Sequence, residues 1–452
     1  MNKHHEFSRR NFVKSSAIGA LGTISIPTLL GGCSNSSPKE ENLIDQEIPE
    51  FISKAVDGKP LKAGLVGCGG RGSGAALNFL AAGDGLQITA LGDVFQDKLD
   101  ASREALKAKG QDISDANCFV GFDNHKKVID SGVDIVLLCT PPIFRPEHFD
   151  YAVEKGIHCF MEKPCATDPT GVRQILVAHK KSISQGLSVV TGTALRSQRD
   201  IIETQRRVAN GAIGQITSAH MSRMGGMLWF RQRERGWSDM EYLLRNWTSF
   251  CSTSGDFIVE QMIHHIDQLN WFMGEKMPVK AEATGGRQRR VTGDMYDHFS
   301  IEYVYEDGMR AHVTSRQIGG CSNAQQYRIS GTKGSTNCEN TIYNLDGSEA
   351  WKYPRPKRDD PDRSLAVPDL FVQEHVRLVN SIRTGKPVHE AELLANSTLM
   401  AIMGRESAYT GKFVTWDEIM ASNQKFSFDK YEFGPIPGFK EEIPLAGAAP
   451  KI

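Results

Sequence analysis

A glycine-rich segment after the first apolar run carries the clearest chemical pattern in the sequence. Gly67-Cys68-Gly69-Gly70-Arg71-Gly72 follows the run 63–66 and precedes a stretch of helical spacing that begins near Gly74. In this pattern the first glycine allows a tight turn, the second lets the backbone approach a pyrophosphate, and the last permits close packing of helix on strand. The helix N-terminus adds amide donors and a positive dipole end. The segment therefore predicts a dinucleotide-binding loop.

Asp93 indicates which dinucleotide binds. It ends the second apolar run about 20 residues after Gly72, the spacing at which a carboxylate meets the ribose hydroxyls next to adenine. The negative charge of an aspartate repels a 2′-phosphate. NAD is therefore expected in preference to NADP.

Alternating strands and helices position this loop. Short apolar runs, typical of buried parallel strands, alternate with stretches of helical spacing. This order predicts a doubly wound parallel sheet of the Rossmann type that ends near Thr193. The expected strands are 63–66, 87–91, 133–139, 158–161 and 187–190, and the expected helices are 75–82, 96–109, 146–155 and 170–185.

A second domain of different texture follows. Longer strands with Gly and Asp at the turns indicate antiparallel pairing. The chain is thus predicted to be α/β, with an N-terminal Rossmann domain and a C-terminal α+β domain built on a large, open-faced, mainly antiparallel sheet. The expected strands are 216–224, 279–283, 296–305, 309–317 and 325–329, with helices at 257–272, 370–384 and 392–410 and a surface loop at 353–368.

Composition limits the classes of function. The 452 residues are 40% hydrophobic and 24% charged, as in ordinary globular proteins. With 53 basic and 54 acidic residues the formal net charge is −1, so no field of one sign would attract nucleic acid. The nine cysteines show neither zinc spacing nor a disulfide framework. We therefore expect no nucleic-acid partner and no metal site.

The N-terminus has the features of an export signal. Ser8-Arg9-Arg10-Asn11-Phe12-Val13-Lys14 resembles the twin-arginine motif, and a short apolar run follows it. Leu30-Gly31-Gly32-Cys33 resembles a lipobox, and the polar segment after it is typical of a tether. These features predict a lipoprotein exported by the twin-arginine route and anchored on the periplasmic side of a membrane through lipid on Cys33. The expected parts are a signal at 1–32, a tether at 33–60, an NAD-binding domain at 61–193, a substrate and oligomerisation domain at 194–425 and a C-terminal extension at 426–452.

Two motifs at the carboxyl ends of strands carry a family resemblance. Thr140-Pro141-Pro142 follows the strand 133–139, Glu162-Lys163-Pro164 follows 158–161, and the segment 255–267 continues the pattern. The sequence resembles the Gfo/Idh/MocA oxidoreductases over nearly all of the chain after the signal, most closely their twin-arginine-exported bacterial branch. The resemblance implies a sugar or cyclitol held between the domains and hydride passed to nicotinamide. It implies cofactor contacts from Gly67, Gly69, Gly70, Arg71, Gly72, Asp93, Thr140, Pro141, His148, Glu162 and Lys163.

The resemblance also implies a reaction centre of Lys163, Glu260 and His264. The last two are four residues apart and would share one face of a helix. His264, with a pKa expected near neutrality, would take the hydroxyl proton as general base. Lys163 would stabilise alkoxide character, and Glu260 would orient the imidazole or the sugar. Most family members have Asp where Glu260 stands, and the adjacent His265 is the alternative base.

Other residues are candidates for contact with the sugar. Arg196 follows the last Rossmann strand, and the segment 229–237, rich in aromatic residues and arginine, leads to Arg245 and Trp247. Such groups suit sugar faces and hydroxyls but are equally typical of protein interfaces. A metal held by Glu260, His264 and Asp267 is a weaker alternative, because no further His or Cys lies at ligand spacing. The candidate substrate residues are Arg196, Arg245, Trp247, Asp267 and Tyr296.

Export also bears on the redox cycle. Because free NAD is not expected outside the cytoplasm, NAD is expected to be loaded before export and to stay tightly bound. The favoured activity is a sugar or glycoside dehydrogenase that forms a keto-sugar and whose NADH is reoxidised in place. One alternative is a redox-neutral glycosidase, in which the sugar is oxidised, undergoes elimination, is hydrated and is then reduced again. The other alternative is a non-catalytic sugar-binding lipoprotein. A homo-oligomer formed through the open sheet is also expected.

Overall fold

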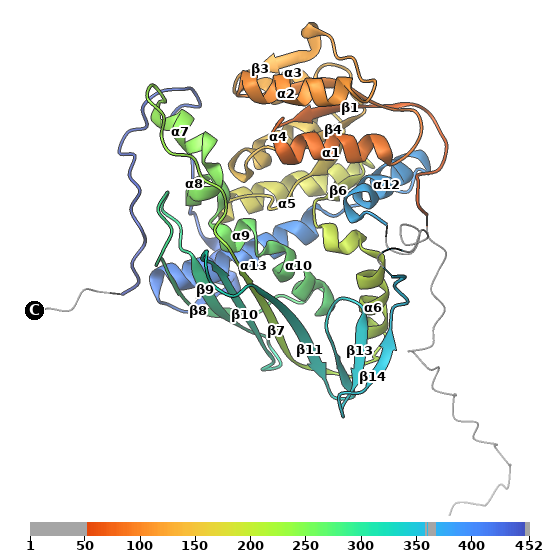
Figure 1. The fold of residues 1–452 in the computed structure, drawn as a ribbon, viewed down its shortest axis with the longest axis vertical. Coiled ribbons are helices and arrows are strands. Elements are labelled where there is room, and N and C mark those ends of the chain that lie inside the picture. Colours follow the sequence, from red (N-terminus) through yellow and green to blue (C-terminus); the bar gives the residue numbers. More distant parts are fainter. Residues whose placement is uncertain (1–51, 358, 360–367, 448–452) are drawn as a thin grey trace, which may run out of the picture. The chain divides into compact units, whose positions relative to one another are not determined.

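The computed structural model describes residues 52–357, 359 and 368–447. The expected signal, Cys33 and most of the expected tether lie outside these residues, as does most of the expected loop after Pro356. Figure 1 shows that two sheets organise the described chain, one with helices around it and one with helices over a single face. The α/β class with a parallel first sheet and a mainly antiparallel second sheet is confirmed.

The first sheet has six parallel strands in the order β3-β2-β1-β4-β5-β6. This order puts β1 beside β4 in the middle, at the switch point where doubly wound sheets bind ligands beyond the carboxyl ends of their strands. The short β3 was not predicted, because three residues carry no readable periodicity. The strands are β1 (Leu61–Val66), β2 (Leu86–Asp93), β3 (Cys118–Val120), β4 (Ile135–Leu138), β5 (His158–Met161) and β6 (Val189–Thr191).

Six helices of the described chain pack around this sheet. Five connect its strands, and the last of these, α5, begins where the Asp168 side chain accepts a hydrogen bond from the Gly171 amide. The sixth helix, α12, comes from far along the chain, and its apolar residues join the core around β1. Residues from both sides of the expected domain boundary at 193 therefore share this core. They are α1 (Gly70–Ala81), α2 (Gln96–Lys107), α3 (Asn124–Ile129), α4 (Arg145–Glu154), α5 (Pro169–Ser184) and α12 (Leu370–Arg383).

The second sheet has nine strands in the order β14-β13-β12-β11-β7-β10-β9-β8-β15. Only the β7–β10 pair among them is parallel. Buried residues alternate with exposed ones along β10, as expected for a sheet with one face on the core. The strands are β7 (Ile216–Gly225), β8 (Lys280–Gly286), β9 (His298–Val304), β10 (Arg310–Gln317), β11 (Ala324–Gly331), β12 (Gly334–Thr336), β13 (Thr341–Asn344), β14 (Glu349–Lys352) and β15 (Val414–Thr415).

The predicted single helix at 257–272 is wrong, because it is two helices. The amide of Met262 donates to the carbonyl of Phe257, five residues back, and this wider turn separates α9 from α10. Glu260 and His264 therefore belong to different helices. The remaining helices are α6 (Arg199–Ala209), α7 (Asp239–Arg245), α8 (Cys251–Ser254), α9 (Phe257–Glu260), α10 (Ile263–Phe272), α13 (Ala391–Thr410) and α14 (Trp416–Ala421).

The described end segments pack onto the body of the protein. The amide of Ala55, inside the expected tether, donates to the carbonyl of Ala82 at 2.8 Å. In the C-terminal extension, Phe428, Ile436 and Phe439 join an apolar cluster with α7. Among the described residues, no helix combines the length and the apolar character needed to cross a membrane.

Candidate active site

The glycine loop is packed on one side and open on the other. Gly67 has a φ of +96°, and a Cβ there would lie 2.7 Å from the Thr140 amide nitrogen. A Cβ on Gly72 would lie 1.8 Å from the carbonyl oxygen of Gly67, so no side chain fits at either position. Gly69 and Gly70, at the start of α1, have nothing within 4 Å of a Cβ position. The open backbone at a helix N-terminus suits a pyrophosphate.

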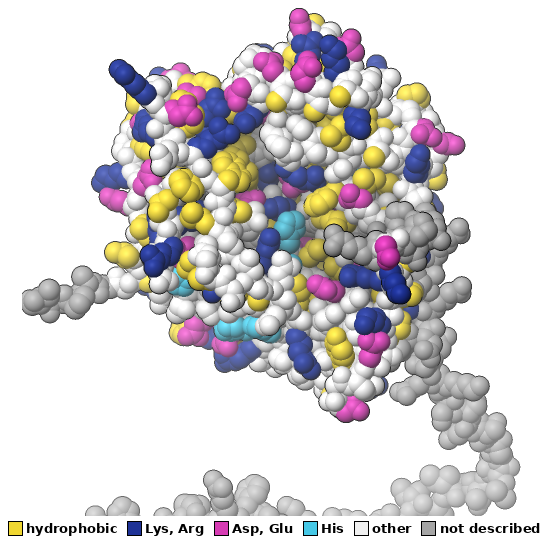
Figure 2. Space-filling model, in the orientation of Figure 1, with side chains coloured by type: hydrophobic (Ala, Val, Ile, Leu, Met, Phe, Trp, Pro, Cys, Tyr) yellow, Lys and Arg dark blue, Asp and Glu magenta, His cyan; other side chains and the backbone are white. Residues whose placement is uncertain are grey.

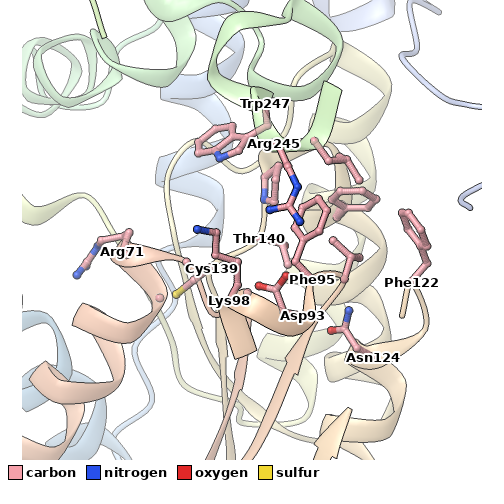
Figure 3. Close-up of a pocket in the computed structure, with 18 of the residues that line it drawn as sticks. Arg71, Asp93, Phe95, Lys98, Phe122, Asn124, Cys139, Thr140, Arg245 and Trp247 are labelled. Carbon is pink, nitrogen blue, oxygen red and sulfur yellow. Dashed lines mark hydrogen bonds between the residues drawn. The ribbon is translucent and has the colours of Figure 1, made fainter. Parts of the chain in front are cut away.

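A cavity of about 420 Å³ lies against this loop (Figure 3). The first domain supplies most of its wall, and the segment 229–247 supplies the rest. The predicted cofactor residues that line it are Gly67, Gly69, Gly70, Arg71, Gly72, Asp93, Thr140, Pro141 and His148.

Asp93 stands in this wall at the carboxyl end of β2. Its Oδ2 accepts a hydrogen bond from the Cys68 amide at 2.6 Å, and its Oδ1 accepts one from the Phe95 amide at 2.9 Å. Burial raises the pKa of the Asp93 carboxyl, against the lowering effect of these bonds. The two bonds fix the carboxylate and leave each oxygen a further lone pair for a ribose hydroxyl.

Arg245 and Trp247, for which contact with the sugar stays a prediction, line the dinucleotide cavity. The Arg245 guanidinium lies 4.1 Å from the ring centre of Phe95, and its Nη2 lies 3.1 Å from Oδ1 of Asp97. Figure 3 shows the Arg245 side chain directed toward Phe95 and Asp93. The reason is tertiary, because the segment before α8 crosses back to the first domain. Sequence reasoning also missed Phe95 and Lys98 in this wall, although both follow Asp93 within five residues.

Arg71 and Glu162 form a partly buried ion pair, in which the Arg71 Nε lies 2.5 Å from Oε1 of Glu162. The Nη2 of Arg71 lies 3.3 Å from Oε2 of Glu374 on α12. Burial and the charge of Glu162 hold the pKa of Glu374 well above its usual value. In Figure 3 the Arg71 side chain points away from Asp93. Glu162, expected to contact the cofactor, uses its carboxylate to hold Arg71, and Arg71 in turn reaches Glu374 of α12.

His148 supports the cavity wall next to Thr140. Its Nδ1 lies 3.3 Å from the Thr140 hydroxyl oxygen, and its ring stacks on His125 with centroids 4.0 Å apart. Burial, followed by the charge of His125, lowers the pKa of His148 well below its ordinary value. The imidazole is therefore neutral and serves as a packed wall group.

Lys163 and Glu260 meet where the two domains join. The Lys163 Nζ donates to the Glu260 carbonyl oxygen at 2.6 Å and to its Oε1 at 2.9 Å. Burial alone would raise the pKa of Glu260, but the charge and hydrogen bond of Lys163 hold it below the ordinary value. Behind them the buried Arg145, which sequence reasoning missed, donates to the carbonyl of Pro164. The pair is thus an ionised couple with one lysine N–H left over.

The two adjacent histidines have different surroundings. Burial and the nearby charge of Lys163 lower the pKa of His264 well below its usual value, so its imidazole is neutral, whereas a value near neutrality was expected. His265 stacks on Tyr327 of β11 with centroids 4.3 Å apart, and its Nε2 lies 2.8 Å from the tyrosine hydroxyl. Thus His264 is the histidine beside Lys163, while His265 is held against the second sheet.

Three candidate substrate residues are buried in the protein interior. The guanidinium of Arg196 meets Asp267 through two contacts, Nε to Oδ2 at 2.8 Å and Nη2 to Oδ1 at 2.9 Å, with the side chains 6% and 1% exposed. Tyr296 donates to the carbonyl of Pro444 at 2.8 Å and packs on Tyr409. These residues pair with one another or with the C-terminal extension, and their contact with a sugar stays a prediction. Because the Asp267 carboxylate is paired with Arg196, it is not available to bind a metal together with Glu260.

A glycine loop open toward a cavity, an acid at the end of the second strand and this strand order define a dinucleotide-binding Rossmann domain. Residues 61–189 match the model of the oxidoreductase family with an NAD-binding Rossmann fold, and residues 201–337 match the GFO/IDH/MocA C-terminal domain. The chain therefore belongs to the Gfo/Idh/MocA oxidoreductase family, and its first domain is NAD-binding.

Similar proteins include dehydrogenases of cyclic polyols and glucosides. The chain is 24% identical over 217 residues to myo-inositol 2-dehydrogenase of Thermotoga maritima, covering 48% of this chain and 56% of that protein. It is 24% identical over 178 residues to D-glucoside 3-dehydrogenase of Escherichia coli, covering 39% and 47%. The chain thus spans about half the length of the curated relatives it matches. Among solved structures, GenD2 from gentamicin A biosynthesis in complex with NAD has a TM-score of 0.61 at 15% identity, covering 81% of this chain and 99% of that one.

Proposed function

We propose that the protein oxidises a ring hydroxyl of a sugar or glycoside to a keto group, with NAD as hydride acceptor. The observation that carries this proposal is the grouping of Lys163, Glu260 and a neutral His264 at the junction of an NAD-binding domain and the second sheet. The names of the relatives, which refer to inositol and glucosides, support the choice of substrate class.

The residues of the site suit removal of a hydroxyl proton. His264, neutral because of burial and the charge of Lys163, accepts the proton as general base. The third N–H of Lys163 donates to the same hydroxyl oxygen and stabilises its developing negative charge. Glu260 occupies the other two N–H groups and so fixes the lysine. The backbone at Gly69 and Gly70 and the Asp93 carboxylate would hold NAD, which when bound supplies the hydride acceptor.

NAD in this site is proposed to be resident, and the walls of the cavity support that. Phe433 of the C-terminal extension stacks on Phe95 with centroids 5.4 Å apart and lies 5.3 Å from the ring of Phe122. Both partners line the dinucleotide cavity, and the guanidinium of Arg245 also lies over the ring of Phe95. Release of the nucleotide would thus require movement of segments that are packed together.

The cellular setting is also a proposal. The N-terminal sequence supports export by the twin-arginine route and attachment through lipid on Cys33, and the open face of the second sheet supports a homo-oligomer. Metabolic labelling with palmitate, compared between the natural chain and Cys33→Ala, tests the lipid. Light scattering of the lipid-free chain tests the oligomer.

Acid denaturation of natively exported protein tests the proposed function directly. We expect close to one NAD or NADH per chain, and NADH fluorescence appearing when myo-inositol or a methyl glucoside is added. Glycoside hydrolysis without net NADH would favour the redox-neutral glycosidase. Chains without nucleotide that bind sugar but do not reduce added NAD would favour the non-catalytic alternative.

A further inference from the structure

A second cavity, of about 360 Å³, lies where β7 and β10 end and β11 begins, next to Gln261. Its wall carries two arginines among neutral side chains and contains neither Asp nor Glu. Figure 2 shows a hollow in one face of the protein in which histidine and basic side chains are visible, whereas the wall of the second cavity contains no histidine. The polar residues of the cavity wall include Arg223, Gln261, Ser315, Arg316, Asn323 and Gln325.

Gln261 connects this cavity to the reaction centre. Its side-chain amide donates to Oε2 of Glu260, and its backbone carbonyl accepts a hydrogen bond from the Nη1 of Arg223 at 3.1 Å. The charge of Arg223 also contributes to lowering the pKa of His264, after burial, Lys163 and His265. A molecule whose hydroxyl meets His264 is therefore within reach of this wall.

Among the described residues, the two arginines have only carbonyl hydrogen-bond partners. Besides the bond from Arg223 to Gln261, the Nη2 of Arg316 donates to the Ser322 carbonyl at 2.5 Å, and the Nε of Arg316 is buried without a hydrogen-bond partner. By contrast, Arg310 on the same strand pairs with Glu302. Two guanidinium groups in a wall without a carboxylate favour an anion from outside the chain.

We infer that this cavity binds an anionic group of the substrate, so that the enzyme acts on an acidic sugar: a uronate, or a sugar carrying a sulfate or phosphate ester. The inference rests on the proposed function for the sugar's position at His264. The arginines bind the anion by charge-assisted hydrogen bonds, and the amides of Asn323 and Gln325 offer neutral donors beside them.

Binding to the NAD-loaded protein, measured by calorimetry, tests the inference without requiring turnover. The probes are D-glucuronate, glucose 6-sulfate and glucose 6-phosphate, each compared with glucose. At least one anion is expected to bind about 10- to 100-fold more tightly than glucose, and the one that does identifies the group. If all three bind no more tightly than glucose, the inference is wrong. If an anion binds tightly but no NADH forms, the proposed dehydrogenase activity is wrong and the anion-binding cavity is still supported.

Substitution of the arginines assigns the effect to this cavity. Arg316→Gln is expected to remove most of the preference for the anion and leave glucose binding unchanged, and Arg223→Gln is expected to act in the same direction. Arg310→Gln, an equal change of charge on β10 outside the cavity wall, is the matched control and should keep the preference. Retention of the full preference in both Arg316→Gln and Arg223→Gln would overturn the inference.

Discussion

The Nζ of Lys163, beyond the end of β5, contacts Glu260 of α9 twice, at 2.6 Å through the backbone carbonyl and at 2.9 Å through Oε1. One residue of the second domain thereby fixes the lysine of the first. Because two of three N–H groups are used in this way, the direction of the third is set. The proposed reaction centre therefore takes residues from both domains.

Replacement of Lys163 tests this arrangement. Lys163→Met removes the donor to the developing oxyanion, and kcat is expected to fall about 10²- to 10⁴-fold. Bound NAD, measured after acid denaturation, should stay near one per chain, because the glycine loop and Asp93 are unchanged. A kcat within a few-fold of the natural enzyme would refute the role of Lys163.

The acid limb of the pH profile reports the state of His264. Since burial and Lys163 lower its pKa well below 6.5, the imidazole stays neutral as the pH falls through 6.5. Glu260, whose pKa is also lowered, stays ionised over the same range. We expect kcat/KM to remain flat through pH 6.5 and to decline only at more acidic pH. His264→Ala should lower kcat/KM at every pH, whereas an acid limb centred at or above 6.5 in the natural enzyme would contradict the assignment.

Asp93 is expected to set the choice of dinucleotide. Asp93→Ala loses the bonds to the ribose hydroxyls and the repulsion of a 2′-phosphate together, so the NAD to NADP affinity ratio should fall about 10- to 100-fold. Competition of the two nucleotides for the emptied protein measures the ratio. Asp115→Ala, which removes a carboxylate that is 92% exposed and lies outside the cavity wall, is the control, and an unchanged ratio in Asp93→Ala would refute the placement.

Phe433 tests whether the C-terminal extension retains the nucleotide. Phe433→Ala removes the stacking on Phe95 and should speed NAD release roughly tenfold, the scale of a lost aromatic contact. Nucleotide left on the protein after repeated gel filtration measures release. Leu445→Ala, in the same extension but 86% exposed, should release NAD as slowly as the natural chain. If Phe433→Ala and Leu445→Ala retain NAD equally well, the C-terminal extension does not hold the nucleotide in the protein.

The ion pair of Arg196 and Asp267 is expected to matter for stability. Asp267→Ala leaves a buried guanidinium with only Glu275 as acidic partner, and the free energy of unfolding should fall by about 3 to 5 kcal/mol. Glu442→Ala, which breaks the exposed pair with Lys440, should change it by less than about 1 kcal/mol. Urea denaturation compares the two. A similar small effect in both would show that the buried pair does not support the fold.

The sequence alone determined the elements whose signals are local. The turn of Gly67, the close packing at Gly72 and the acid at the end of the second strand act over a few residues, so the strand-loop-helix unit was predicted before its geometry was known. The parallel strands are buried on both faces, so their sequences are continuous apolar runs. The second sheet is buried on one face, so buried and more exposed residues alternate along its strands.

Only the tertiary structure decided which distant side chains meet. Arg196 and Asp267 stand 71 positions apart and are predicted from the sequence as contacts for a sugar, yet in the structure they form a buried ion pair. Likewise, Arg245 of the second domain lines the dinucleotide cavity, and α12 packs on the core of the first sheet. The break between α9 and α10 places Glu260 and His264 on different helices, the charge of Lys163 contributes to lowering the pKa of His264, and His265 meets Tyr327. Periodicity describes each segment's own faces, whereas these contacts depend on how the segments pack together, which no short stretch of sequence encodes.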